Sequence, residues 1–134
     1  MKKILFDSTI IIDFIRNTAD TISLIDHYLN HYHEMTFSAI TKYEILRGYE
    51  VIKAERKKAE FIAFCDDHEI LPITDEIINK AAIIYGDLHR KGQLIGDADV
   101  LIGATAITNQ LPILTHNIKH FKVIDGLVLA DFSE

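Results

Sequence analysis

The sequence has 134 residues, of which 49% are hydrophobic and 25% are charged, and its formal net charge is −6. We therefore expect one soluble globular domain over residues 1–134, and we exclude disordered, collagen-like and disulfide-stapled proteins. Cys65 is the only cysteine and no apolar run reaches the ~18 residues of a membrane span, which predicts a cytoplasmic protein without membrane contact. The acidic charge gives no overall attraction to nucleic acid, so any phosphate contacts would depend on local basic residues.

Short apolar runs alternate with helical patterns along the chain. The runs predict buried strands at residues 4–6, 35–37, 70–73, 113–114 and 127–129. Apolar residues recur at three- and four-residue spacing over 25–32 and 77–88, the second pattern following Thr74 as a helix N-cap and preceding Gly92 as a stop. This alternation predicts an α/β layer fold with a mainly parallel sheet.

The segment 100–107 is apolar almost all round and includes the small residue Gly103, which predicts a helix pressed closely against the sheet. Phe61, Ile62 and Cys65 have the spacing of core residues, so we expect Cys65 to be buried rather than a nucleophile. Two pairs of histidines four residues apart, His27/His31 and His116/His120, lack the acidic or cysteine partners of a zinc site, so we do not expect zinc.

Several polar residues follow predicted strands or open predicted helices. Asp7 ends the first strand, and Glu44 lies in the opening turn of a helix that we expect to begin near Thr41. Asp97 and Asp99 open the buried helix, and Asn117 follows the strand at 113–114. Because the carboxyl ends of parallel strands share one edge of a sheet, we expect these residues on one rim.

Carboxylates gathered on a rim repel one another unless a cation lies between them. Mg²⁺ or Mn²⁺ would suit oxygen ligands, and such an ion can polarise a phosphoryl oxygen and activate water. Each acid also has a structural interpretation: Asp7 as an N-cap, Thr41 and Glu44 as a capping box, and Asp97 or Asp99 as partners of a helix dipole. Spacing alone leaves both interpretations open.

Four segments then resemble the PIN-domain ribonucleases, and most closely the VapC-type toxins of bacterial toxin–antitoxin pairs. In chain order, these segments are residues 4–9 with 12–13, residues 37–44 with Leu46 and Gly48, residues 95–104, and residues 114–117 with Phe121 and 126–127. The resemblance implies a three-layer α/β/α fold with a central, mainly parallel sheet. It also implies a Mg²⁺-dependent endoribonuclease toxin that cuts structured RNA such as tRNA or rRNA to leave 5′-phosphate ends. A VapB-like antitoxin and a homodimer are the partners implied.

By position, Asp7, Glu44 and Asp99 match the acidic metal-site residues of that family, and Asn117 matches a fourth polar group that contacts metal through water or orients substrate. Asp97 is an additional candidate, although residues two apart on a helix point about 200° away from each other.

Ser8 and Thr115 would orient the carboxylates and bound water. Two positions depart from the family pattern. Thr9 stands where many relatives have Asn, so the supporting contact that this Asn makes in the family is not expected at Thr9. Asn117 is neutral where some have Asp, so we expect one well-held ion and a second only with substrate.

Two other functions remain as alternatives. Asp7 at the end of a first strand would suit the nucleophile of an aspartyl-phosphate phosphatase, although Thr9 stands where that chemistry usually has a second acid. The acids could also be helix caps in a non-enzymatic binding module. A dinucleotide-binding or P-loop protein is disfavoured because neither glycine-rich motif is present.

Overall fold

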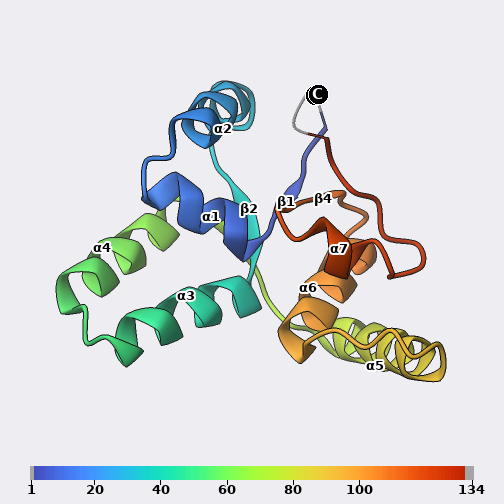
Figure 1. Cartoon of the computed structure of the whole chain (residues 1–134). Coiled ribbons are helices and arrows are strands. Elements are labelled where there is room, and N and C mark those ends of the chain that lie inside the picture. The colour runs from blue at the N-terminus through green and yellow to red at the C-terminus, as the bar shows by residue number, and fades with distance from the viewer. Residues whose placement is uncertain (1, 132–134) are drawn as a thin grey trace.

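The computed structural model describes residues 2–131. In chain order, its elements are β1 (Leu5–Phe6), α1 (Ser8–Ile15), α2 (Ala19–Tyr32), β2 (Thr36–Ser38), α3 (Ala39–Val51), α4 (Glu55–Asp66), β3 (Glu69–Leu71), α5 (Asp75–Arg90), α6 (Asp97–Thr108), β4 (Ile113–Leu114) and α7 (Ile118–Phe121). Helices α1–α4 lie on one side of the strands and α5–α7 on the other (Figure 1). Over this part of the chain, every helix is too short or too polar to cross a membrane.

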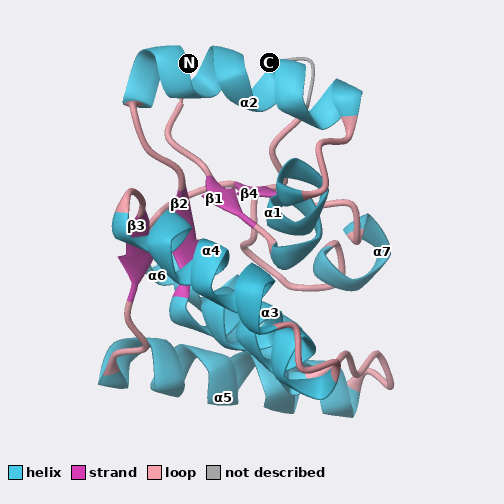
Figure 2. Ribbon diagram, turned by 90° about the vertical axis from the view of Figure 1, so that its left-hand side faces the viewer, coloured by secondary structure: helices cyan, strands magenta, loops and turns pink. Residues whose placement is uncertain are grey.

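The strands pair in parallel. β1 pairs with β4, with Leu5 opposite Ile113, and β2 pairs with β3, with Phe37 opposite Ile70. β1 and β2 lie side by side between α2 and α5 (Figure 2). The prediction of an α/β fold with a mainly parallel sheet is therefore confirmed.

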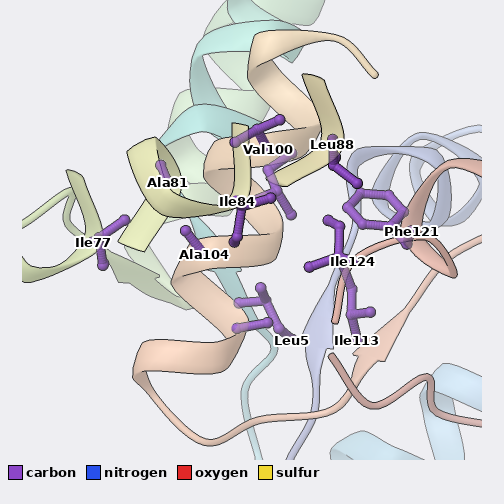
Figure 3. Close-up of a cluster of buried hydrophobic side chains, with 12 residues drawn as sticks. Leu5, Ile77, Ala81, Ile84, Leu88, Val100, Ala104, Ile113, Phe121 and Ile124 are labelled. Atoms are coloured by element: carbon purple, nitrogen blue, oxygen red, sulfur yellow. The ribbon is translucent and has the colours of Figure 1, made fainter. Parts of the chain in front are cut away.

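The core is divided by the strands into two apolar clusters. Neighbouring residues on a strand point to opposite faces. Leu5 and Ile113 accordingly pack with α5 and α6, whereas Phe6 and Leu114 pack with the apolar faces of α1, α2 and α4. Figure 3 shows the first cluster. Because each strand is covered on both faces, the molecule has the three-layer α/β/α architecture implied by the resemblance.

One predicted helix feature is confirmed, and a second differs in its packing partner. Thr74 is the N-cap of α5, where its hydroxyl accepts a hydrogen bond from the Ile77 amide at 3.2 Å. Gly103 lies where α6 approaches its neighbours closely, because a Cβ there would come 2.7 Å from Ile124 Cδ1. The sequence pattern predicted close packing against the sheet, whereas the close neighbour at this small residue is Ile124, which follows α7.

Three local predictions were wrong. Helix α3 begins at Ala39 rather than near Thr41, because the hydroxyl of Ser38 at the end of β2 already caps it by accepting from the Ile40 amide at 3.0 Å. Glu44 therefore lies beyond the first turn and is not part of a capping box. The predicted strand at 127–129 is reduced to one bridge between Leu129 and Ile113, since β4 is only two residues long.

The third error concerns α4. Phe61 and Cys65 are buried as predicted, but Ile62 is 42% exposed. Residues four apart lie on one face of a helix, whereas the next residue is turned about 100° away. Only the narrow strip that carries Phe61 and Cys65 meets the core.

Candidate active site

Asp7 directly follows β1 and is only 2% exposed. It occupies the N-cap position of α1, but its side chain makes no capping hydrogen bond there. Instead, its Oδ2 accepts hydrogen bonds from the Thr115 hydroxyl at 2.6 Å and the Thr9 hydroxyl at 3.0 Å. Burial raises the pKa of this carboxyl, and the two hydroxyls offset part of that rise.

The same two hydroxyls join the ends of β1 and β4. Thr115 Oγ1 accepts from the Asn117 amide at 2.8 Å, and Thr9 Oγ1 accepts from the His116 amide at 3.1 Å. Thr9 therefore supports Asp7, although its place in the family pattern had put that contact in doubt. Its signal in the sequence is only its spacing of two residues from Asp7.

Glu44 lies in the second turn of α3 and is held by Ser8. The Ser8 hydroxyl donates to Glu44 Oε1 at 2.7 Å and also lies 3.1 Å from the Thr41 hydroxyl. Burial raises the pKa of Glu44, and the negative charges of Asp7 and Asp99 raise it further. Ser8 thus contacts one carboxylate of the rim, and its part in orienting a metal site stays a prediction.

Asp99 is the third residue of α6, and its carboxylate faces the segment that follows β4. Its Oδ2 lies 2.8 Å from His120 Nδ1 and 3.4 Å from Asn117 Nδ2. His120 is a residue whose role the sequence pattern did not reveal, since it was considered only as half of a histidine pair. The one sequence signal that could have identified His120 is its position three residues after Asn117.

Asp97 does not join this group. It is exposed at the first position of α6, after the N-cap residue Gly96. The two acids of α6 thus point in different directions, as helix geometry predicts for residues two apart. The structure brings Asp7, Glu44 and Asp99 within electrostatic reach of one another and leaves Asp97 outside.

The donor chemistry of these three residues fits a hard divalent ion. Burial raises the pKa of Asp7 and of Glu44, and neighbouring negative charges raise both further, which is unfavourable without a cation. All three residues offer carboxylate oxygens. Within residues 2–131, no three acidic, histidine or cysteine side chains already stand close enough to enclose an ion. Glu44 is hydrogen-bonded to Ser8 and Asp99 to His120, so metal binding would require these contacts to adjust.

The fold is that of the PIN class of nucleases, and the PIN domain model matches residues 4–127. Ribonuclease VapC1 of Rickettsia felis is 34% identical, covering 97% of this chain and 96% of the relative. Ribonuclease VapC1 of Methanocaldococcus jannaschii is 33% identical, covering 96% and 88%. A crystal structure of DNA-bound VapBC from Salmonella typhimurium superimposes with a TM-score of 0.86 at 27% identity, covering 98% of this chain and 99% of that chain.

The chain belongs to the PIN-domain family and, within it, to the VapC-type ribonucleases. The family membership that the four sequence segments indicated is therefore confirmed. The protein is an endoribonuclease of a family whose nucleases generally depend on divalent metal ions.

Proposed function

We propose that this chain is a Mg²⁺- or Mn²⁺-dependent endoribonuclease toxin of the cytoplasm, with residues 1–134 acting as one nuclease domain. Asp7, Glu44 and Asp99 hold the metal, and Asn117 assists. The observation that carries this assignment is the convergence of three acids from the end of β1, from α3 and from α6, where, beyond the effect of burial, the charge of Asp99 raises the pKa of both Asp7 and Glu44. Helix capping does not account for this convergence, because Asp7 makes no capping bond and Glu44 lies beyond the first turn of its helix.

The residues of the chain have distinct roles in this proposal. Asp7, fixed by two threonine hydroxyls, is the rigid ligand, and Glu44 is oriented by Ser8. Asn117 lies beside Asp99 and offers an amide that orients RNA or a bound water. When bound, the divalent ion supplies positive charge at the scissile phosphate and lowers the pKa of the attacking water.

The chemistry is hydrolysis of an RNA phosphodiester bond. Water attacks phosphorus, the bond to the 3′ oxygen breaks, and the products carry a 5′-phosphate and a 3′-hydroxyl. We propose structured RNA, tRNA or rRNA, as the substrate. The phosphatase alternative is disfavoured because a nucleophilic Asp7 would have to be accessible, whereas this side chain is buried and accepts two hydrogen bonds on one oxygen.

The proposal includes a VapB-like antitoxin as the inhibitor and a second copy of the chain as a partner. Support for the antitoxin comes from the VapBC complex of Salmonella typhimurium, whose toxin fold this chain shares at 27% identity. Co-expression with a VapB-like antitoxin, followed by purification, tests both partners by mass and by inhibition of RNA cleavage.

The acids of α6 provide a matched test of the active site. Asp99→Asn and Asp97→Asn make the same change of charge two residues apart on one helix, but only Asp99 faces the proposed metal site. We expect Asp7→Asn and Asp99→Asn to lower the rate of RNA cleavage by at least about 10²-fold, since each removes a metal ligand. Asp97→Asn should retain the wild-type rate, and chelation by EDTA should abolish cleavage until Mg²⁺ or Mn²⁺ is restored.

Sequencing of new 5′-phosphate RNA ends measures these rates and identifies the cut site. Thermal unfolding checks that Asp7→Asn is as stable as the wild type or more stable, because its burial no longer involves a charge. Equal cleavage by the Asp97 and Asp99 variants would disprove the site assignment.

A further inference from the structure

Three polar atoms form a small triangle at the open side of the acidic centre. Asp99 Oδ2 and Asn117 Nδ2 each lie 2.8 Å from His120 Nδ1, and they lie 3.4 Å from each other. We propose that Asp99, Asn117 and His120 form one face of a divalent-ion shell in which the His120 imidazole is a direct ligand, so that the centre prefers Mn²⁺ to Mg²⁺. This inference rests on the proposed function, and it names Mn²⁺ as the ion that the same site prefers.

The size of the triangle fits adjacent ligands of one ion. An ion bound octahedrally at about 2.1 Å holds neighbouring ligand atoms about 3.0 Å apart. The three separations, 2.8, 2.8 and 3.4 Å, lie around that value. The oxygen and nitrogen of an amide are exchanged by rotating the side chain, so Asn117 can present its oxygen where Nδ2 now lies.

A hydrogen-bond network is the alternative interpretation of the same triangle, and in the amide orientation of the structure it contains a conflict. A ring nitrogen of histidine either carries a proton and donates or has a lone pair and accepts. Nδ1 of His120 therefore cannot donate to Asp99 and accept from Asn117 at once. A cation removes the conflict, because carboxylate oxygen, amide oxygen and neutral imidazole nitrogen all then act as lone-pair donors.

The position of His120 is set by the fold, while its ring stays accessible. It lies on α7, next to Phe121, which is fully buried and packs near Ile124 in the core (Figure 3). The His120 side chain itself is 47% exposed, compared with 19% for Asp99. The His120 ring is thus open to solvent, whereas the Asp7 carboxylate is buried.

Selectivity follows from the nitrogen ligand. Mg²⁺ binds oxygen ligands and keeps several waters, so an imidazole adds little to its affinity. First-row transition ions accept imidazole readily, and Mn²⁺ also suits the carboxylate oxygens of the remaining ligands. His120 should therefore strengthen Mn²⁺ binding selectively.

The experiment compares the wild-type chain with His120→Asn and with His89→Asn, which changes an exposed histidine on α5. Calorimetry measures the Kd of Mn²⁺ and of Mg²⁺, and pulsed EPR of bound Mn²⁺ detects coupling to a directly bound ¹⁴N nucleus. We expect nitrogen coupling in the wild type and in His89→Asn. His120→Asn should lose it, and the preference for Mn²⁺ should fall by roughly tenfold, the low end of losses on removing groups that set a metal site.

Bound Mn²⁺ without nitrogen coupling, or an unchanged Mn²⁺/Mg²⁺ preference in His120→Asn, would overturn the inference and leave the triangle as a hydrogen-bond network only. Asp7→Asn separates this result from failure of the nuclease site. If Asp7→Asn abolishes RNA cleavage while His120→Asn leaves metal preference unchanged, the proposed function stands without the histidine ligand. If Asp7→Asn leaves both Mn²⁺ binding and RNA cleavage intact, the assignment of Asp7 as a metal ligand fails.

Discussion

The Thr115 hydroxyl connects the most buried acid of the site to the segment that carries Asn117. It donates to Asp7 Oδ2 at 2.6 Å and accepts from the Asn117 amide at 2.8 Å, and the residue is 5% exposed. Because water has little access to replace either bond, this one hydroxyl both favours the ionised form of Asp7 and fixes the start of α7. Thr115 is therefore a positioning residue for two parts of the site.

Replacing Thr115 with valine keeps the shape of the side chain and removes the hydroxyl. We expect Thr115→Val to lower the free energy of unfolding by about 1–3 kcal/mol, because a buried donor and a buried acceptor lose their partner. RNA cleavage should slow as well, since Asp7 is no longer held. Urea unfolding and the rate of cleavage measure the two effects.

Thr105→Val is the matched control for this change. Thr105 is also buried, but its hydroxyl donates to the Leu101 carbonyl of its own helix at 2.8 Å. This variant should cleave RNA at the wild-type rate. An equal loss of activity in both variants would show that cleavage depends on general stability rather than on the bond to Asp7.

Sequence reasoning located the three acids of the site but not all of the residues that contact them. Asp7, Glu44 and Asp99 follow strands or open helices, so parallel topology alone places them at one edge. Thr9 and His120 could not be assigned in this way. The His116 amide that Thr9 accepts from is 107 residues away, and His120 is 21 residues from Asp99, so their contacts depend on the tertiary fold rather than on local pattern.

Among the elements, α6 shows how close packing supports the site. It carries Asp99 at its start and Gly103 one turn later, where it meets Ile124 and Leu127. Ile124 is 3% exposed, so its side chain has little room to move away from an added methyl group. The position of Asp99 therefore depends on a glycine that lets the helix lie close to the C-terminal segment.

Gly103→Ala tests this packing. The substitution gains up to about 1 kcal/mol of helix propensity, but overpacking a core costs about 1–3 kcal/mol. We expect a net loss of stability of about 1 kcal/mol in chemical denaturation. Gly86→Ala on α5 should instead be stabilising, because the added Cβ would meet only the end of the flexible Arg90 side chain. Stabilisation by both substitutions would contradict the close approach at Gly103.

The types of element were predictable, whereas some of their limits were not. Strand-forming runs and the N-cap at Thr74 were recognised because the responsible residues are neighbours in sequence. The start of α3 was misplaced because Ser38 and Thr41 are both good cap residues, and the choice depends on where β2 ends. The pattern at 127–129 suits a strand, but extending it into one requires a longer partner than β4 provides.

For the whole molecule, an ion pair beside the β2–β3 pair makes stability depend on pH. Lys3 Nζ lies 2.6 Å from Glu69 Oε1, which also accepts a hydrogen bond from the Thr36 hydroxyl. These hydrogen bonds lower the pKa of Glu69 below its usual value of 4.5. Since the folded state favours the ionised form, this contribution is complete above about pH 4.5 and is lost as pH falls through the lower folded pKa.

We expect Glu69→Gln to lower the free energy of unfolding at pH 7 by less than about 1 kcal/mol, because both partners are partly exposed. The difference from the wild type should shrink as the pH is lowered towards 3. Urea unfolding over this range measures it. Glu34→Gln, at an exposed position preceding β2, should change stability by no more than about 0.5 kcal/mol at any pH.

The parallel pairing of β1 with β4 joins residues 108 positions apart, as the bond from Thr115 to Asp7 also does. A growing polypeptide on the ribosome would already contain Asp7 and Glu44 while it still lacked α6 and β4. Contacts of such long separation slow folding, and synthesis itself adds only about 5–20 residues per second. Nuclease activity therefore cannot arise on the nascent chain until most of it has been translated, which would delay damage to RNA during the toxin's own synthesis.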